Sequence, residues 1–167
     1  MTENMLKYRF LNGYLPESSQ KKLVILTGAR QTGKTTLAKL KYPHLRYINL
    51  DAPENRETIR RISTAAWFKT VGNAVIDEAQ KEPLVFEKIK YAFDEGSVSF
   101  SLLLGSSQIL MLKNIRESLA GRATIYEIWP LMMSELYLEY GNMPSNPPLI
   151  DYLLSLPGFN KLSLIHI

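Results

Sequence analysis

The stretch ILTGARQTGKTTLAKL, residues 25–40, joins an apolar run to a helical pattern through a loop of small and polar residues. The apolar run, LVIL at residues 23–26, contains no polar position, as is typical of a strand covered on both faces in a parallel sheet. The loop contains Gly28 and Gly33, and Lys34 comes directly before a helical pattern at residues 35–41. A strand, a glycine-rich loop and a helix in this order predict the first unit of an alternating α/β fold.

The rest of the chain continues this alternation. Short apolar or β-branched runs predict four further strands, at residues 47–50, 74–76, 100–104 and 124–129. Helical patterns follow at residues 54–70, 84–94, 109–119 and 132–140, and residues 142–148 form a Pro-rich linker. We therefore expect an α/β protein with a mainly parallel, five-stranded sheet, in which right-handed crossovers place helices on both faces. The predicted buried stripes of two helices are Ile59, Ile62 and Ala66, and Val85, Ile89 and Ala92.

Composition excludes several classes of protein. The 167 residues suit one domain, and 46% hydrophobic with 22% charged residues is ordinary for a soluble globular protein. The absence of cysteine excludes disulfides and thiolate metal sites, and neither His44 nor His166 has neighbours at metal-ligand spacing. A net charge of +4 is too small to indicate nucleic acid by itself. No secretory signal is evident, and the most apolar stretch is interrupted at residues 105–108, so we expect a cytoplasmic protein without a membrane span.

Residues 28–35, GARQTGKT, match the phosphate-loop pattern G-x-x-x-x-G-K-[ST] without a mismatch. Glycines let backbone N–H groups turn inward around phosphate oxygens, and the helix that follows directs its positive dipole end to the same place. We expect Lys34 to neutralise the β- and γ-phosphates of a nucleotide, and the Thr35 hydroxyl to take one site on Mg²⁺. The alternative is a glycine-rich turn with an exposed lysine. The predicted nucleotide-binding residues are Gly28, Ala29, Arg30, Gln31, Thr32, Gly33, Lys34, Thr35 and Thr36.

An acidic pair ends the third predicted strand, in the segment NAVIDEAQ. Ligands of open α/β sheets bind at the C-terminal edge of the strands, which is where this pair is delivered. Asp77 is therefore expected to hold Mg²⁺ through its water shell, and Glu78 to take a proton from the attacking water. The alternative is that the two acids only cap a helix that begins at Ala79.

Weaker candidates stand at other strand ends. Asn49 is placed to hydrogen-bond Glu78 and hold it off the water, or is an ordinary strand-end amide. A hydroxyl of Ser106 or Ser107 is placed to orient the attacking water, although turns also favour serine there. Arg116 and Arg122 flank a predicted helix, and either guanidinium could stabilise transition-state charge across a subunit boundary or remain a solvated surface group.

Five segments together resemble one known family: LTGARQTGKTTLAK, YINLDAPENRE, VIDEAQKEP, LLLGSSQILML and SLAGRATIYEIWPLMMSEL. They are similar to the bacterial and archaeal AAA-superfamily ATPases that carry an uncharacterised C-terminal domain, sometimes proposed to be nuclease-like. The resemblance covers residues 23–140, and the DEAQ, GSSQ and SLAGR segments occur in the expected order and spacing.

The resemblance implies a P-loop NTPase fold, a three-layer α/β/α sandwich with strand order 5-1-4-3-2. It implies ATP and Mg²⁺ as cofactors and a possible homo-oligomer, because the family's arginine, Arg122 in AGR, is inferred to act across a subunit boundary. The roles that it implies are Lys34 and Thr35 in phosphate and Mg²⁺ binding, Asp77 at the metal, Glu78 in catalysis and Ser107 (or Ser106) as a sensor.

The resemblance also implies the domain organisation. Residues 1–140 are expected to form the ATPase core, and residues 141–161 the start of a linker or C-terminal region. Residues 162–167, LSLIHI, resemble a translation of the transposon end sequence used to prepare sequencing libraries. We therefore expect the chain to be an N-terminal fragment cut near Lys161, lacking the C-terminal region and any helical lid that lies there.

Three functions are compared. The leading hypothesis is an ATPase in which Mg²⁺-dependent hydrolysis moves a partner or the missing C-terminal region, with DNA or protein as the partner. The alternatives are a small-molecule phosphotransferase and a nucleotide-gated binding switch with little turnover. A nuclease is not favoured, because the acids Asp51, Glu54 and Glu57 suit a loop and helix start, and no lysine stands in the usual relation to them.

Overall fold

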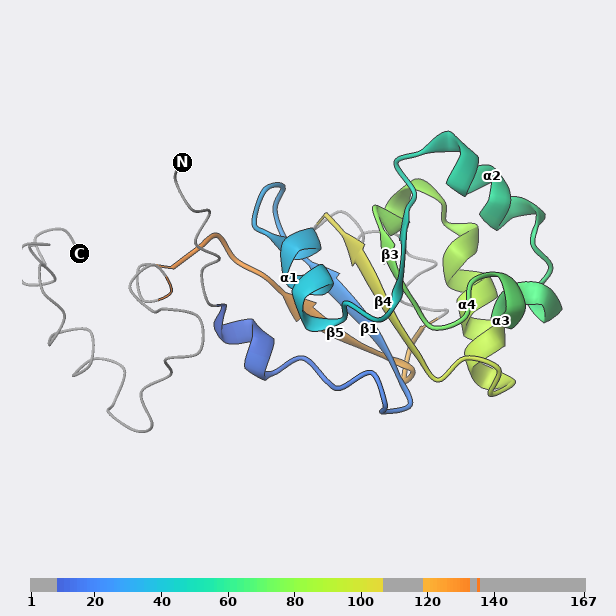
Figure 1. Cartoon of the computed structure of the whole chain (residues 1–167), viewed down its shortest axis with the longest axis horizontal. Coiled ribbons are helices and arrows are strands. Elements are labelled where there is room, and N and C mark those ends of the chain that lie inside the picture. The colour runs from blue at the N-terminus through green and yellow to red at the C-terminus, as the bar shows by residue number, and fades with distance from the viewer. Residues whose placement is uncertain (1–8, 107–118, 133–134, 136–167) are drawn as a thin grey trace, which may run out of the picture. The chain divides into compact units, whose positions relative to one another are not determined.

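The computed structural model describes residues 9–106, 119–132 and 135 (Figure 1). The described residues form two compact units, one of them Tyr14–Pro130. The other contains the 3₁₀ turn η1 (Phe10–Gly13), where the buried Glu135 carboxylate accepts a hydrogen bond from the Phe10 N–H at 2.8 Å and pairs with Arg9. Every candidate site residue that the structure describes lies in the unit Tyr14–Pro130.

The sheet has five parallel strands: β1 (Lys22–Thr27), β2 (Arg46–Asn49), β3 (Ala74–Asp77), β4 (Phe100–Gly105) and β5 (Ala123–Glu127). Their order is β2-β3-β4-β1-β5, which confirms the order 5-1-4-3-2 that the resemblance implied. Because all strands run the same way, their C-terminal ends meet at one edge of the sheet. The phosphate loop after β1 and the acidic pair at the end of β3 therefore share that edge.

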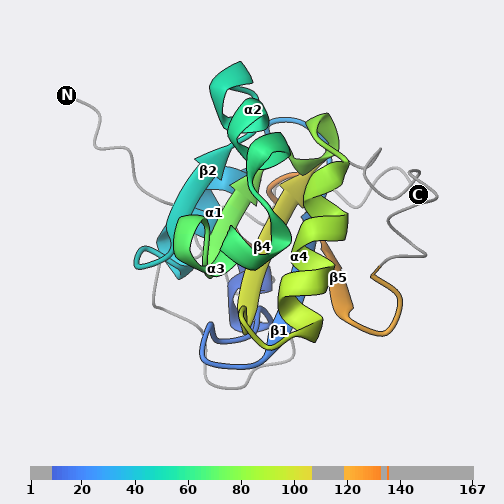
Figure 2. The same cartoon turned by 90° about the vertical axis from the view of Figure 1, so that its right-hand side faces the viewer.

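Helices cover both faces of the sheet, as predicted. Helix α1 (Lys34–Lys41) lies on one face, and α2 (Pro53–Arg61), α3 (Trp67–Thr70) and α4 (Leu84–Asp94) lie on the other (Figures 1 and 2). Two short 3₁₀ turns, η2 (Thr64–Ala66) and η3 (Ala79–Lys81), join these elements. The helix of residues 84–94 has the predicted bounds, and Val85, Ile89 and Ala92 are buried as expected.

The core explains why the strand sequences read as unbroken apolar runs. β3 and β4 are buried at every position, and β1 at every position after Lys22. Alternate residues of β1, Leu23 and Ile25, pack in one cluster with Ile89 of α4. On the other face, Tyr42 at the end of α1 contacts the ring of Phe100 with centroids 5.1 Å apart. The strands of a parallel sheet that is buried on both faces show no alternation of apolar and polar residues in the sequence.

The single helix predicted over residues 54–70 is wrong. α2 ends at Arg61, and Ile62 adopts an extended conformation with φ −64° and ψ 127°. The Ser63 hydroxyl then accepts a hydrogen bond from the Ala66 N–H at 3.3 Å and caps η2. Serine competes for backbone groups in this way, so it favours caps over helix interiors. Of the predicted stripe, only Ile59 is fully buried, because the break turns Ile62 partly outward.

Some sequence predictions fall outside the described residues. Nearly all of the helix of residues 109–119 and of the helix of residues 132–140 is among them. The domain boundaries at residues 140 and 161 remain predictions. Within the described parts of the chain, no helix is long and apolar enough to cross a membrane.

Candidate functional site

The loop between β1 and α1 has the backbone conformation that its glycines allow. Gly28 has φ 152° and Gly33 has φ 90°, and Gln31 also enters the left-handed region with φ 63°. A Cβ added to Gly28 would lie 2.3 Å from the carbonyl oxygen of Ile128, so only glycine fits beside the end of β5. Positive φ values turn successive backbone N–H groups toward one side, which makes an anion-binding hollow.

Lys34 is the first residue of α1 and is buried. Its Nζ donates hydrogen bonds to the carbonyl oxygens of Gly28 at 2.9 Å and Ala29 at 2.6 Å. Burial lowers the pKa of Lys34 from its ordinary value, and the carboxylates of Glu78 and Asp77 act in the opposite direction. Lys34 is therefore not the exposed lysine of a simple turn. It is a desolvated cation that lies against the loop and faces two carboxylates.

The Asp77 carboxylate joins three segments of the chain. Its Oδ2 accepts hydrogen bonds from the Thr35 hydroxyl at 2.6 Å and from the Tyr47 hydroxyl at 2.7 Å. Its Oδ1 accepts a bond from the backbone N–H of Glu78 at 2.8 Å. Burial and the bond to Asp77 raise the pKa of Tyr47 well above its ordinary range, so its hydroxyl remains a donor. Three donors fix a buried carboxylate beside the first turn of α1.

Glu78 has an unusual backbone conformation for a residue that is not glycine. Its φ of 53° and ψ of 39° lie in the left-handed region, which costs roughly 1 kcal/mol. Its side chain makes no capping bond to η3, so the pair does not act as an ordinary helix cap. Instead Glu78 Oε2 accepts a hydrogen bond from the Gln80 side-chain amide at 2.6 Å. The strained backbone turns this carboxylate toward the cavity in front of the loop.

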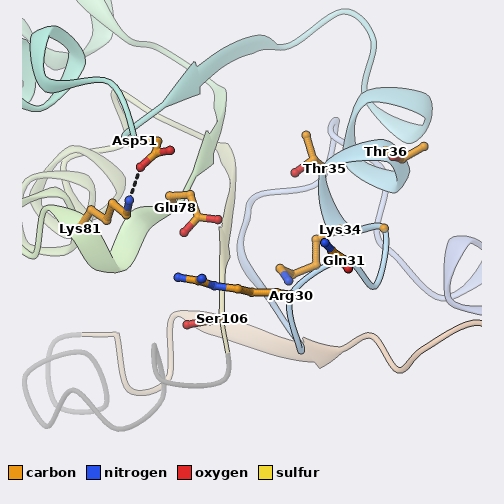
Figure 3. Close-up of a pocket in the computed structure, with 10 residues that line it drawn as sticks. Arg30, Gln31, Lys34, Thr35, Thr36, Asp51, Glu78, Lys81 and Ser106 are labelled. Atoms are coloured by element: carbon orange, nitrogen blue, oxygen red, sulfur yellow. Dashed lines mark hydrogen bonds and ion pairs between the residues drawn. The ribbon is translucent and has the colours of Figure 1, made fainter.

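A cavity of about 580 Å³ lies at this edge of the sheet, a size that suits a nucleotide. Figure 3 shows Lys34, Thr35 and Thr36 on one side, Glu78, Asp51 and Lys81 on the other, and the Arg30 side chain extending from the loop toward Glu78. Asp51 and Lys81 form an ion pair across the ends of β2 and η3. The lining residues are Arg30, Gln31, Gly33, Lys34, Thr35, Thr36, Asp51, Glu78, Lys81 and Ser106.

The oxygen donors at this edge fit Mg²⁺. A threonine hydroxyl and a carboxylate, 2.6 Å apart, are hard ligands of the kind that Mg²⁺ prefers. Among the residues that the structure describes, no group of three or more His, Cys, Asp or Glu forms a closed metal cage. This donor set fits a cation that takes most of its ligands from water and phosphate, and Thr35 and Asp77 are the residues that would hold it.

Several predicted residues lie elsewhere. The Asn49 side-chain oxygen accepts a hydrogen bond from the Asp51 N–H at 2.9 Å, which agrees with the alternative of an ordinary strand-end amide. Ser106 lines the cavity, whereas Ser107 and Arg116 lie outside the described residues.

Arg122 pairs with Asp94 at 2.7 Å and precedes β5, level with the start of β1. At ~3.3 Å per residue, the length of β1 separates Arg122 from the loop of its own chain by roughly 16 Å.

Four residues of the site were missed from the sequence: Tyr47, Asp51, Gln80 and Lys81. Asp51 was assigned only to a loop and helix start. A signal existed for Lys81, because it follows the acidic pair at the strand end, where ligands bind. A signal existed for Tyr47 as well, because it is a polar tip on an apolar strand that pairs with β3. For Gln80 no sequence signal distinguishes it from a solvated amide.

Comparison with known proteins agrees with this arrangement. The profile of a family described as AAA domain matches residues 20–137. The chain belongs to this family and therefore contains the core of an AAA-superfamily ATPase, a class of ATPase-like, nucleotide-binding domains. The match begins just before β1 and includes the whole sheet.

Particular relatives say less about function. The chain is 33% identical over 117 residues to the uncharacterized proteins Rv2008c of Mycobacterium tuberculosis and Mb2031c of Mycobacterium bovis. The matched segment is 68% of this chain but 26% of each relative, so the chain spans about a quarter of their length. Among solved structures, RIF2 of Saccharomyces cerevisiae is similar with a TM-score of 0.43 and 11% identity, over 74% of this chain and 56% of that one. That likeness carries no argument about function.

Proposed function

We propose that this domain binds ATP with Mg²⁺ in the cavity at the end of β1 and hydrolyses its terminal phosphate. The observation that supports the proposal most is the hydrogen bond from Thr35 to Asp77 at 2.6 Å. It joins the phosphate loop to β3, which ends at Asp77 directly before Glu78, so the groups proposed to bind phosphate, hold the metal and accept a proton lie at one edge of the sheet.

Each residue has a distinct part in the proposed reaction. Loop N–H groups and the N-terminus of α1 bind the phosphates, and Lys34 exchanges its two carbonyl partners for phosphate oxygens. Thr35 and Asp77 would hold Mg²⁺, which supplies charge neutralisation of the phosphates. Glu78 accepts the proton of the attacking water, and Ser106, or Ser107 beside it, orients that water.

The use of hydrolysis is proposed to lie outside this domain. Because the relatives are about four times as long as the matched segment, we propose that the cycle drives a conformational change in a C-terminal region that contacts DNA or protein. Arg122 lies far from the loop of its own chain, so a part in the reaction requires a neighbouring copy in a homo-oligomer. We propose a cytoplasmic location.

One observation favours a second function, a nucleotide-gated switch with little turnover. Gln80 donates a hydrogen bond of 2.6 Å to the carboxylate that would act as the base. The bond occupies one oxygen of this carboxylate and holds the side chain in place, so an attacking water must compete with Gln80 for that oxygen. If this bond persists with nucleotide bound, the domain binds ATP and hydrolyses it slowly.

The test uses three variants of the chain and measures nucleotide affinity and phosphate release without any added acceptor. Lys34→Ala removes the charge on the β/γ-phosphates and is expected to abolish binding. Glu78→Gln keeps the size of the side chain but cannot accept a proton, so affinity is retained while hydrolysis falls by about 10²-fold or more. Lys69→Ala, on the exposed surface of α3, controls for the loss of one positive charge.

The outcomes separate the candidate functions. Unchanged affinity and turnover in Lys34→Ala would overturn the assignment of the loop. Equal turnover in the parent and Glu78→Gln would remove Glu78 from the mechanism. Tight ATP binding with negligible phosphate release by the parent would favour the switch, and release that requires a small-molecule acceptor would favour a phosphotransferase.

A further inference from the structure

The cavity contains a third cation besides Lys34 and Arg30, and nothing in the phosphate-loop pattern accounts for it. We propose that Lys81 binds the terminal phosphate of the nucleotide, in exchange for its ion pair with Asp51, and so makes the site distinguish a triphosphate from a diphosphate. This inference rests on the proposed function, because it needs a nucleotide in the cavity.

Lys81 is placed for this contact by the turn that carries Glu78. It lies three residues after Glu78, in η3, and the Lys81 backbone N–H donates a hydrogen bond to the Glu78 carbonyl at 2.9 Å. Both side chains line the cavity on the side away from α1 (Figure 3). Under the proposed function, the terminal phosphate lies in front of Glu78, on this side of the cavity. A group that faces the water-activating carboxylate therefore also faces the phosphate that the water attacks.

The partner of Lys81 is one that a phosphate can replace. Asp51 and Lys81 are both exposed, with 58% and 39% of their side-chain surfaces accessible, so solvent weakens their attraction. The pKa of Asp51 lies below its ordinary value because of Lys81 first, with smaller effects of Arg56 and Arg30. Asp51 thus keeps cationic neighbours when Lys81 leaves it. The flexible four-carbon stem of lysine allows the ammonium to turn from one anion to the other.

The charges of the cavity favour the exchange. Three cations, Arg30, Lys34 and Lys81, and two carboxylates, Asp51 and Glu78, line it. In the structure, Lys34 is bound by loop carbonyls and Lys81 by Asp51, so each of these two lysines has a partner before nucleotide binds. A terminal phosphate placed before Glu78 meets like-charge repulsion there, and Lys81 is the neighbouring lysine that offsets it. A diphosphate does not bring this charge.

The experiment compares dissociation constants for Mg²⁺ with ADP and Mg²⁺ with the slowly hydrolysed triphosphate adenylyl imidodiphosphate. The variants are Lys81→Ala, Asp51→Asn and the double substitution. Two changes in the exposed ion pair of α2, Arg61→Ala and Glu57→Gln, remove the same charges outside the cavity and serve as matched controls. Because Lys81 and Asp51 are exposed, a thermal melt of each variant is expected to match the parent within about two degrees.

Lys81→Ala is expected to weaken triphosphate binding about tenfold and ADP binding less than twofold, as the loss of one charged hydrogen bond predicts. Asp51→Asn frees Lys81 and is expected to strengthen triphosphate binding about threefold in the parent, with less than half of that gain in the Lys81→Ala background. The control variants leave both constants unchanged.

Two results would overturn the assignment of Lys81 alone. One is that the parent binds ATP but Lys81→Ala changes the dissociation constants of both nucleotides equally, or changes neither. The other is an equal gain from Asp51→Asn in both backgrounds, which would mean that Asp51 acts only by general repulsion. If the parent binds neither nucleotide, the proposed function fails and the role of Lys81 fails with it.

Discussion

Replacing Tyr47 by Phe tests whether the position of Asp77 determines the response to Mg²⁺. The change removes one oxygen atom and its hydrogen bond of 2.7 Å to Asp77, and it keeps the ring that lies 4.1 Å from Lys39 Nζ. Asp77 retains two of its three donors, Thr35 and the Glu78 N–H. A hydrogen bond to a charged group contributes about 1.5–3 kcal/mol, and loss of a residue that orients a metal ligand reduces metal affinity roughly 10–100-fold. We expect the affinity for Mg²⁺ to fall about tenfold, the low end of this range, because two donors to Asp77 remain.

The assay measures ATP affinity at a series of Mg²⁺ concentrations. In Tyr47→Phe, the Mg²⁺ concentration at half of the full effect is expected to rise about tenfold, while ATP affinity without Mg²⁺ stays within twofold of the parent. Tyr42→Phe is the matched control. It also removes a tyrosine hydroxyl in a short bond, here 2.6 Å to the Pro16 carbonyl oxygen, and leaves Asp77 untouched.

Two results would refute the reasoning. An unchanged Mg²⁺ dependence in Tyr47→Phe would show that Thr35 and the backbone suffice to orient Asp77. An equal shift in Tyr47→Phe and Tyr42→Phe would show that the effect comes from general destabilisation of the fold.

Three further predictions concern stability and are read from unfolding curves. Gly28→Ala is expected to lower the free energy of unfolding by about 3 kcal/mol or more, because its Cβ would lie 2.3 Å from a carbonyl oxygen. Gly96→Ala, at φ 75° with no atom within 4 Å of the added Cβ, is expected to lower it by only about 1–2 kcal/mol. Equal losses in the two variants would contradict this. Burial, and then the nearby Glu17 carboxylate, raise the pKa of Tyr42 above its ordinary 10.0. The stability that this shift contributes is complete below pH 10 and is lost above it at about 1.4 kcal/mol per pH unit, until the folded form also ionises; Tyr42→Phe should show a shallower alkaline decline. Lys88→Met removes hydrogen bonds to the carbonyls of Ile59 and Arg60 in α2 and of Ile62 just after it, and it should lose about 1–3 kcal/mol, unlike Lys90→Met, which also lies on α4.

The strands were predictable from the sequence for a physical reason. A fully buried parallel strand favours several consecutive apolar residues, and residues 23–26, 74–76 and 102–104 satisfy this without reference to the rest of the chain. The break at Ile62 and Ser63 was not predictable in the same way. The apolar spacing of Ile59, Ile62 and Ala66 suits one continuous helix. The break is stabilised by the Ser63 hydroxyl, which accepts a bond from the Ala66 N–H, and by Lys88 of α4, which bonds the Ile62 carbonyl and is distant in the sequence.

The candidate site likewise contains some residues that the sequence predicts and others that only the fold brings together. The phosphate loop is one continuous segment, so the sequence pattern alone predicts its chemistry. The position of Asp77 in the site is predicted because it stands at the end of a strand. Tyr47 reaches Asp77 only because β2 is the neighbour of β3, with Asn49 opposite Asp77 in the register. Asn49 lies opposite Asp77 in this register, and its side-chain oxygen bonds to the backbone two residues on, as an asparagine at a strand end commonly does.

The order of the strands also separates the glycine-rich loop after β1 from the groups on and after β2 that contact Asp77 and Lys81. β1 has a hydrogen-bonded neighbour on both sides, and its loop is fixed further by the contact of Gly28 with Ile128, whereas β2 pairs only with β3 among the described strands. An edge strand of four residues opens at a lower free energy than a central one. β2 leads to Asp51 and carries Tyr47, the groups that bear on Lys81 and Asp77. Under the proposed function, a force that displaces β2 alters the groups proposed to position the metal ligand and to bind the terminal phosphate before it alters the phosphate loop, so nucleotide stays bound while its hydrolysis changes.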